Sequence, residues 1–556
     1  MPHASSYPPI DIPNVDLWSL VFDSHGRYGH FPKTKEIMTD AETGRTYSWA
    51  DLHSGSVEFG QGLQAVWQWK KGDVLAMYTP NSIDTAIITL GAIWAGGIVS
   101  PANPLYTADE LAFQLRDSGA KALVTQTAFL DTAVNAASKA GIPTDRIILI
   151  GDGRDPTGRF RHFSAIRPDF SGGRQYEKPA VDPERDLVFL VYSSGTTGLP
   201  KGVCLTHRNL AANTAQAEYL EGCHWQSTGG IDGKGDKLLG VLPFFHIYGL
   251  MCVMLMSIVK GVQVIVMARF DLEKALQAIQ DYRISIVYIP PPVVLALGKL
   301  PAVDKYDLTS LRILHSGAAP LTRELTEAVW NRLKVPVKQG FGLSETSPVT
   351  HSQQLHEWAM FMGSIGKLVP NMEAKIVNEA GEEVGDDEAG ELWLKGPNVF
   401  VGYLNSPERT AEAFSADGYF KTGDICRRDA KGNYYVVDRL KELIKYKGFP
   451  VPPAELEGIL VSHPDITDAC VIGVQDHAQA TEVPLAFVVL RPGVAGTPEK
   501  GGELAAWLAE RVAPHKRLRG GVRFVDVIPK SASGKILRRL VRDQMAREER
   551  SGGVKL

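Results

Sequence analysis

Short apolar runs alternate with amphipathic windows along much of the chain. The runs are rich in Val, Ile and Leu, which is typical of buried strands. The windows between them have helical spacing, and window 272–282 follows Asp271, a favourable N-cap residue. This alternation predicts an α/β fold with largely parallel sheets sandwiched with helices. We expect strands at residues 74–78, 122–124, 147–150, 262–266, 286–289 and 311–314.

Residues 238–259 form an uncharged stretch of twenty-two residues, long enough to cross a bilayer. Pro243, His246 and Gly249 interrupt its first half, and Lys260 ends it. We therefore interpret it as a buried strand, a loop that carries His246 and a core helix. No integral membrane span is expected.

The pattern changes near Asp438. An alternating run at 432–437 ends there, and the charged segment 438–442 follows. A compact α+β pattern comes next, with a helix expected at 453–461, strands at 469–474 and 485–490, and a helix at 503–512. The change predicts a large N-terminal domain, residues 1–438, and a small C-terminal domain, residues 439–556. Segment 151–186 is rich in Gly, Pro, Asp and Arg and indicates a surface connection.

Composition narrows the class of protein. A chain of 556 residues is too long for one ordinary domain, and 44% hydrophobic and 22% charged residues are ordinary globular values. A formal net charge of -4 argues against a nucleic-acid partner. Five scattered cysteines and an N-terminus without a secretory pattern favour the cytoplasm. The final Val554, Lys555 and Leu556 partly match a peroxisomal Ser-Lys-Leu address, so a peroxisomal location is an open alternative.

Residues 193–202 carry the strongest chemical signal. They hold two Ser, two Thr, three Gly and one Lys directly after the apolar run 187–191. Glycines let backbone N–H groups approach an anion, and hydroxyls and one ammonium add donors. This composition favours a loop that holds a polyphosphate, although an isolated cluster of this kind is as often a flexible surface turn. It is not a P-loop, because Gly202 follows Lys201 where Ser or Thr is required.

The loop is one of several motifs that occur in order: SSGTTGLPKGV, PFFHIYGL, HSGAAPL, QGFGLSETSP, GELWLKG, GYFKTGD, DRLKELIKYKGF and PKSASGKILRR. Together they resemble the adenylate-forming acyl-CoA synthetases, and within them the 4-coumarate–CoA ligase-like enzymes. The resemblance spans most of the chain. It implies that the C-terminal domain is a mobile lid with its hinge near Lys441.

The resemblance also implies an activity: an ATP-dependent carboxylic acid–CoA ligase. The carboxylate attacks the α-phosphate of ATP, giving acyl-AMP and pyrophosphate, and coenzyme A then displaces AMP. The partners implied are a small-molecule acid, ATP and coenzyme A, with Mg²⁺ as cofactor. The small and aromatic pocket residues suit a flat aryl group or a medium acyl chain, and we expect an aryl or cinnamate-like acid.

The resemblance assigns roles to single residues. Lys535 is the lysine that reaches the α-phosphate and the carboxylate; read alone, it is a solvated lysine before a basic helix. Glu345 is the magnesium ligand; alone, it is a surface acid in a turn. His246 is the aromatic gate between the acyl pocket and the coenzyme A tunnel; alone, it is a half-buried histidine with a backbone partner. Lys535, His246 and Lys441 form the predicted catalytic set.

The remaining roles fall into three groups. Asp424 accepts from the ribose hydroxyls, and Arg439 reaches the ribose or phosphate; an isolated Thr-Gly-Asp is more often a β-turn. The predicted ATP and AMP site consists of Ser193, Ser194, Gly195, Thr196, Thr197, Gly198, Lys201, Gly317, Ala318, Ala319, Gln339, Gly340, Phe341, Gly342, Ser344, Asp424 and Arg439. The predicted acyl site consists of Tyr248, Gly249, Gly317, Gly340, Pro348 and Val349, and the predicted coenzyme A site of Lys447 and Gly448.

Phe341 and Ser344 stand where many relatives have Tyr and Thr, and each keeps the aromatic face or the hydroxyl of the residue it replaces. Pro450, Pro452 and Pro453 after the coenzyme A strip are a departure whose effect on the lid the sequence leaves open.

Three other functions were weighed: a medium- or long-chain fatty acyl-CoA synthetase, a stand-alone enzyme that loads a carrier protein, and an acyl-nucleotide binder without activity. The last predicts damage at Lys535, Glu345 or Asp424, and all three residues are present. The sequence leaves the acid and the oligomeric state open.

Overall fold

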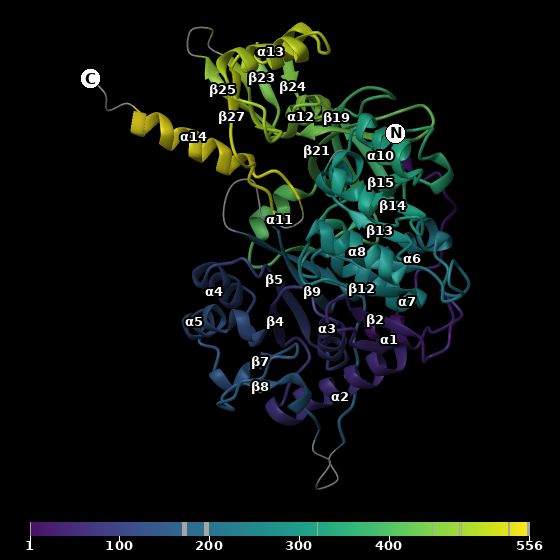
Figure 1. Ribbon diagram of the computed structural model, residues 1–556. Coiled ribbons are helices and arrows are strands. Elements are labelled where there is room, and N and C mark those ends of the chain that lie inside the picture. The colour runs from purple at the N-terminus through teal and green to yellow at the C-terminus, as the bar shows by residue number, and fades with distance from the viewer. Residues whose placement is uncertain are drawn as a thin grey trace.

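The structure is a computed structural model of the chain, shown in Figure 1. It describes residues 2–168, 175–193, 200–319, 321–447, 449–476, 479, 481–531 and 534–552. Within these residues the strands form three larger sheets and two small C-terminal ones. The α/β fold predicted from the sequence is confirmed.

The first large sheet has eight strands and a parallel centre. The six strands from β4 to β9 all belong to this sheet and pair in parallel. Strands β10 and β20 are added at one edge and pair antiparallel. Its order is β20 (Gly402–Tyr403), β10 (Lys201–Thr206), β9 (Leu187–Ser193), β5 (Ile98–Ala102), β4 (Val74–Tyr78), β6 (Ala120–Thr125), β7 (Ile147–Leu149) and β8 (Arg161–His162).

The second large sheet has nine strands. Its centre is again parallel, and antiparallel pairs close both edges. Its order is β17 (Lys367–Leu368), β16 (Val349–Ser352), β15 (Val337–Gly342), β14 (Ile313–Ser316), β13 (Ile286–Ile289), β11 (Lys237–Gly240), β12 (Gln263–Val266), β2 (Glu36–Asp40) and β3 (Thr46–Ser48).

Helices cover both faces of these sheets. Helices α4 (Ala108–Asp117) and α5 (Leu130–Ala140) pack on the face of β4 that carries Ala76 and Tyr78. Helices α8 (Leu272–Tyr282), α9 (Pro291–Lys299) and α10 (Arg323–Leu333) pack on the outer face of the nine-stranded sheet. Because side chains alternate across a strand, the opposite faces are free to meet a shared core.

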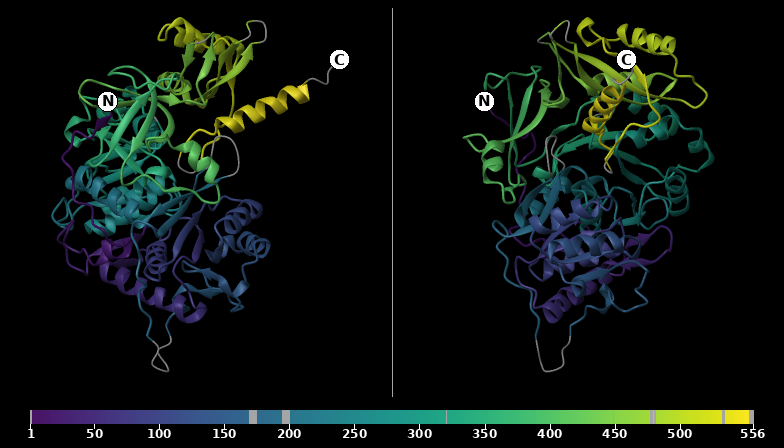
Figure 2. Two further views of the ribbon diagram at one scale, coloured as in Figure 1. Left: turned by 180° about the vertical axis from the view of Figure 1, so that it is seen from behind. Right: turned by 90° about the vertical axis from the view of Figure 1, so that its left-hand side faces the viewer.

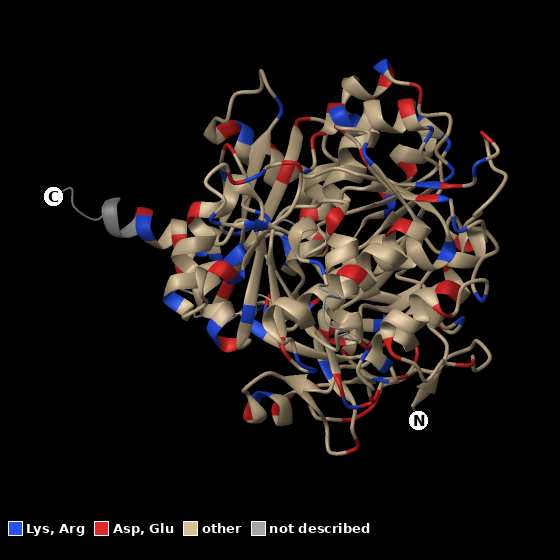
Figure 3. Ribbon diagram, turned by 90° about the horizontal axis from the view of Figure 1, so that it is seen from below, with Lys and Arg blue, Asp and Glu red and all other residues tan. Residues whose placement is uncertain are grey.

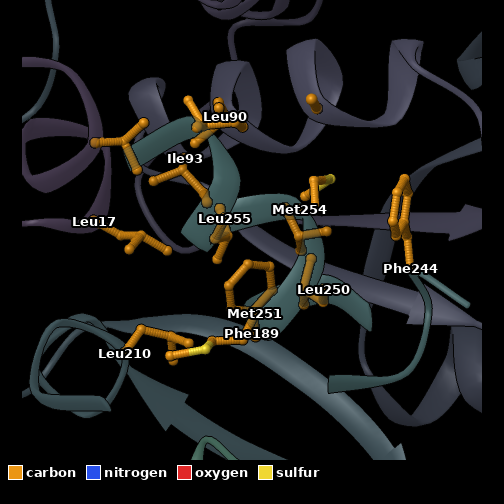
Figure 4. Close-up of a cluster of buried hydrophobic side chains, with 14 of the residues drawn as sticks. Leu17, Leu90, Ile93, Phe189, Leu210, Phe244, Leu250, Met251, Met254 and Leu255 are labelled. Carbon is orange, nitrogen blue, oxygen red and sulfur yellow. The ribbon is translucent and has the colours of Figure 1, made fainter. Parts of the chain in front are cut away.

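The shared core lies between the two sheets and holds the uncharged stretch 238–259. Its residues come from both sheets and from α1 (Leu17–Phe22), α2 (Trp49–Trp67), α3 (Asp84–Trp94), α6 (His207–Leu220), the π-helical segment Tyr248–Leu255 and α7 (Met256–Lys260). Figure 4 shows Leu250, Met251, Met254 and Leu255 of that segment facing Leu90, Phe189 and Leu210. The predicted strand, loop and core helix are therefore confirmed. Among the described residues, no helix has the length and apolar content needed to cross a bilayer.

The expected strands are all present, with small shifts at their ends. The strands expected at 262–266 and 311–314 begin at Gln263 and Ile313. Helix α8 has the expected bounds, and its N-cap Asp271 accepts a hydrogen bond from the backbone of Lys274 at 3.0 Å. Segment 151–186 contains only β8 and a short 3-10 turn within its described part.

A third sheet of five antiparallel strands was only partly foreseen. Its last strand matches the alternating run at 432–437, but its other strands mix charged and apolar residues and gave no apolar run. Its order is β1 (His3–Ala4), β18 (Glu373–Val377), β19 (Gly390–Lys395), β21 (Phe420–Arg428) and β22 (Tyr434–Arg439). Helix α11 (Pro407–Ala413) lies between β20 and β21 in the chain.

The C-terminal region has its own apolar core. It contains the hairpin β23 (Ile444–Tyr446) and β24 (Phe449–Val451), and a sheet of β25 (Ile466–Asp476), β26 (Thr481–Leu490) and β27 (Gly521–Phe524). Helix α12 (Pro453–Ser462) is where it was expected. The helix expected at 503–512 was misplaced: α13 spans Pro498–Ala509, because Thr497 caps it and Pro498 starts it.

Helix α14 (Arg538–Gly552) follows this sheet and extends away from the body of the molecule, as Figure 1 and the left view of Figure 2 show. Its first turns are tied back by ion pairs from Arg538 to Glu457 and from Arg542 to Glu442, at 2.6 and 2.8 Å. Charged residues of both signs are interspersed around the molecule in Figure 3.

Candidate active site

Asp424 and Arg439 face each other across the β21–β22 pair. The Arg439 Nε donates to Asp424 Oδ1 at 3.1 Å. The other carboxylate oxygen of Asp424, Oδ2, is buried and has no hydrogen-bond partner among the described residues. Burial raises the pKa of this carboxyl above its ordinary value, although Arg439 and Lys535 oppose the shift. A buried acceptor without a partner is the feature expected of a site for hydroxyl donors.

Lys535 lies in a tight turn that is held in part by its own backbone. Its carbonyl accepts from the Ser531 N–H at 2.8 Å, and its N–H donates to Ser531 Oγ at 3.1 Å. Gly534 has a φ of +83°, and a Cβ there would lie 2.8 Å from Pro290 Cβ, just before α9. Glycine thus lets the lysine loop seat closely on the nine-stranded sheet's helices.

The pKa of Lys535 depends on the charged residues around it. Burial, together with the cation of Arg439, lowers the pKa of the Lys535 ammonium to about 8, while Asp424 and Glu345 oppose the shift. The structure therefore brings Lys535, Asp424, Arg439 and Glu345 into one electrostatic cluster. These four residues were named from the sequence.

Glu345 and Lys201 both contact Tyr403, a residue that the sequence did not single out. Tyr403 donates its hydroxyl to Glu345 Oε1 at 3.0 Å, and the Lys201 ammonium lies 4.6 Å from the centre of the same ring. Burial and Arg409 lower the pKa of Lys201, and Glu345 opposes this. Tyr403 is 58 residues from Glu345 in the chain, so no local motif joins them.

The glycine-rich motifs follow the carboxyl ends of parallel strands, where ligands bind in open α/β sheets. Gly317, Ala318 and Ala319 come directly after β14, and Ser344 and Glu345 come after β15. Ala318 has a φ of +73°. Gln339, Gly340, Phe341 and Gly342 form the end of β15, and the ring of Phe341 is half-buried.

The predicted acyl residues lie beside β14 and β15. A Cβ on Gly317 would lie 3.1 Å from the Tyr248 hydroxyl oxygen, and one on Gly340 would lie 2.9 Å from the His315 ring. A Cβ on Gly249 would lie 2.3 Å from the carbonyl oxygen of Pro243, so glycine is needed there for backbone packing. Pro348 and Val349 adjoin this region, and both backbone groups of Val349 bind the side chain of Asn213.

A buried polar network lies behind these residues and was missed by the sequence analysis. The Tyr248 hydroxyl and His315 Nδ1 are 3.0 Å apart, and His315 Nε2 is 3.3 Å from Glu221 Oε1. Lys338 Nζ lies 2.8 Å from Glu221 Oε2. Burial alone would raise the pKa of Glu221, but Lys338 and His315 outweigh it and hold the pKa below its ordinary value.

His246 is half-buried, and its Nδ1 accepts from the backbone N–H of Tyr248 at 3.2 Å. Burial, reinforced by the nearby Lys535, lowers its pKa to about 3, so the ring is neutral. The backbone partner matches the interpretation as a half-buried histidine, and the role as a gate stays a prediction. Lys441 is exposed in the turn after β22, and Lys447, with a φ of +48°, contacts Tyr446 and Thr481.

Several predicted residues lie outside the described residues: Ser194, Gly195, Thr196, Thr197, Gly198 and Gly448. Ser193 ends β9 and Lys201 begins β10, so the two flanks of the loop pair with each other.

Comparisons with known proteins identify the family of the chain. The model of the AMP-binding enzyme family matches residues 27–404, and that of its C-terminal domain matches residues 455–535. The chain belongs to the AMP-binding enzyme family. It is 37% identical to 4-coumarate–CoA ligase of Pinus taeda, with 98% of each chain covered. It is 38% identical to 4-coumarate–CoA ligase of Vanilla planifolia, with 98% of this chain and 96% of the relative covered.

Solved structures of AMP-binding enzymes share the fold. ATP-bound MatB from Rhodopseudomonas palustris matches with a TM-score of 0.82 at 26% identity, covering 96% of this chain and 99% of MatB. Benzoate CoA ligase from Burkholderia xenovorans matches with a TM-score of 0.81 at 25% identity, covering 95% and 100%. Apo MatB gives a lower TM-score, 0.72, at the same 26% identity. The arrangement seen here is thus closer to that of the ATP-bound enzyme.

Proposed function

We propose that this AMP-binding enzyme is an ATP-dependent carboxylic acid–CoA ligase that acts on aryl or cinnamate-like acids. The observation that carries the proposal is the position of Lys535 within the cluster of Asp424, Arg439 and Glu345. Four motifs far apart in the chain converge there, and the similarity to 4-coumarate–CoA ligases covers nearly the whole chain.

The charge of Arg439 and the Asp424 Oδ2, which has no hydrogen-bond partner among the described residues, both support nucleotide binding. Asp424 Oδ2 would accept a ribose hydroxyl, and Arg439, already paired with Oδ1, holds that carboxylate in place. The glycines after β9 and β14 would bring backbone N–H groups to the phosphates and leave room for a flat base.

The first reaction joins two anions, and Lys535 counters the charge that accumulates. A carboxylate oxygen forms a bond to the α-phosphorus, and the bond from that phosphorus to the bridging oxygen breaks, so pyrophosphate leaves with the bonding electrons. A positively charged ammonium placed at the α-phosphate stabilises this transition state. With a pKa of about 8, Lys535 is mostly protonated at neutral pH.

Glu345 suits the magnesium ion that the resemblance implies. Its carboxylate is a hard oxygen donor, it is half-buried, and only one of its oxygens accepts a side-chain hydrogen bond from the described residues. When bound, Mg²⁺ would offset the negative charge of the phosphates. Glu345 would supply one ligand oxygen, and Tyr403 would fix the direction of that carboxylate.

In the second reaction, the thiol of coenzyme A attacks the acyl carbon, AMP leaves and the thiol proton is released. His246 would be the gate for the thiol; its contact with the backbone of Tyr248 and the electrostatic effect of Lys535 on its ring support this role. We infer that the lid, residues 439–556, rotates about Lys441 between the reactions. The exposure of Lys441 supports this role, because a hinge must change its backbone angles without breaking packing.

The decisive experiment is pyrophosphate release with a panel of carboxylic acids, followed by thioester formation with coenzyme A. The wild-type protein should release pyrophosphate with 4-coumarate or a related aryl acid and form the thioester. Lys535→Ala should bind ATP with nearly unchanged affinity but form no acyl-AMP, a loss of at least about a hundredfold. Full acyl-AMP formation by this variant, or thioester formation only on a carrier protein, would overturn the proposal.

A further inference from the structure

Tyr403 contacts two residues that the proposed function assigns to the magnesium–ATP complex, Glu345 and Lys201. Its hydroxyl donates to the Glu345 carboxylate at 3.0 Å, and its ring lies under the Lys201 ammonium at 4.6 Å. One half-buried side chain therefore contacts both the candidate metal ligand and the cation at the end of the phosphate loop.

The backbone around Tyr403 is fixed to the same two segments. The Leu404 and Val401 N–H groups donate to the carbonyls of Gly202 and Cys204 on β10, at 2.8 and 3.2 Å. The Phe400 N–H donates to the Glu345 carbonyl at 2.8 Å. Segment 400–404 therefore connects the strand after the phosphate loop to the turn that carries Glu345, so the backbone that carries Tyr403 is anchored to both.

Glu345 needs such a support. It lies in a 3-10 turn of only three residues, and a glutamate side chain has three rotatable bonds. Without a fixed partner, ordering its carboxylate costs side-chain entropy at the moment of binding. The hydroxyl of Tyr403 donates to one carboxylate oxygen, and the other accepts no side-chain hydrogen bond from the described residues.

We propose that Tyr403 is a positioning residue for the magnesium–ATP complex: its hydroxyl orients Glu345 toward the metal, and its ring holds Lys201 over the phosphates. This inference rests on the proposed function. It predicts that the hydroxyl affects only metal-dependent nucleotide binding, whereas the ring affects nucleotide binding with or without metal.

The test is calorimetric ATP binding to the whole protein, with Mg²⁺ and separately with a chelator. Tyr403→Phe should weaken binding with Mg²⁺ by about fivefold, the size of one ordinary hydrogen bond, and leave binding in chelator unchanged. Tyr403→Leu should weaken both, because the cation–π contact with Lys201 is also lost.

The chain offers a matched control in Tyr419. Its hydroxyl donates to Glu373 at 2.7 Å, and Lys375 lies 4.4 Å from its ring centre, on β18. Tyr419→Phe should change neither binding constant. An unchanged magnesium effect in Tyr403→Phe, or an equal loss in both conditions with a lowered unfolding temperature, would overturn the inference. Wild-type protein that binds no ATP in either condition would instead count against the proposed function.

Discussion

Lys535 shows how one residue depends on its surroundings for its chemistry. An exposed lysine keeps its charge at any physiological pH, but burial beside Arg439 lowers the pKa of this one to about 8. The ammonium is therefore charged below that pH and neutral above it, close to working conditions. Asp424 and Glu345 limit the shift, so the residue stays usable as a cation.

This lowered pKa gives a pH prediction. For acyl-AMP formation, kcat/KM for ATP reports the free enzyme, so it should be constant at neutral pH and fall about tenfold per pH unit above about 8. Pyrophosphate release across that range measures it. In Lys535→Arg, whose guanidinium stays protonated, the alkaline fall should disappear whatever its overall rate. A wild-type profile that stays level far above pH 8 would contradict the prediction.

Single residues were foreseen only where a linear motif carries them. Lys535, Glu345 and Asp424 lie in short motifs with glycine neighbours, and the structure brings them together. The sequence did not predict roles for Tyr403, His315 and Glu221, because their partners are remote in the chain. Lys338, for example, is 117 residues from Glu221. Contacts of this kind depend on how sheets are stacked, which periodicity does not encode.

At the scale of elements, the uniformly apolar strands were predictable and the mixed ones were not. Strand β4 is buried along its whole length and reads as one apolar run. Strand β21 contains Gly423, several charged residues and half-buried positions, so its sequence resembles a loop. Asp424, the proposed ribose acceptor, lies on that strand, and its burial could therefore not be foreseen from pattern alone.

The Glu221 network should stabilise the junction of several elements. Glu221 follows α6, Lys338 lies on β15, and Tyr288 on β13 donates its hydroxyl to the same carboxylate at 3.3 Å. Glu221→Gln leaves the buried Lys338 without a counter-charge, so the free energy of unfolding should fall by about 3 kcal/mol. Denaturant unfolding midpoints measure the change.

A surface pair provides the comparison for that substitution. Glu327 and Arg323 lie 2.8 Å apart on α10 and are largely exposed. Glu327→Gln should cost less than about 0.5 kcal/mol, because water screens exposed ion pairs. Equal losses in the two variants would show that the Glu221 network does not contribute as a buried pair.

At the scale of the whole molecule, the lid approaches the body through small residues. A Cβ on Gly458 of α12 would lie 2.2 Å from Thr322 Cγ2, the N-cap residue of α10, and Lys299 donates to the Val461 carbonyl at 2.6 Å. Gly534 approaches Pro290 in the same manner. Under the proposed function, these contacts would hold the lid in the pose in which Lys535 lies beside Asp424 and Glu345.

Gly458→Val should therefore hinder the lid pose used for acyl-AMP formation and leave accessible the pose used for thioester formation. Acyl-AMP formation should slow by about tenfold or more, whereas conversion of supplied acyl-AMP to the thioester should be nearly unchanged. The two reactions are measured separately. Gly502→Val on α13 is the control, because a Cβ there meets nothing within 4 Å. Equal slowing of both reactions by Gly458→Val would count against two lid poses.

The projecting helix α14 has a practical consequence. It begins three residues after Lys535 and, at about 1.5 Å per residue, carries the chain roughly 20 Å outward. If the lid rotates as proposed, the ion pairs with Glu457 and Glu442 would make the helix turn with it as a rigid lever. A fluorescent dye near its far end, paired with a second dye on α5, would convert a small rotation at the hinge into a large change in energy transfer, and so report each catalytic cycle without touching the chemistry.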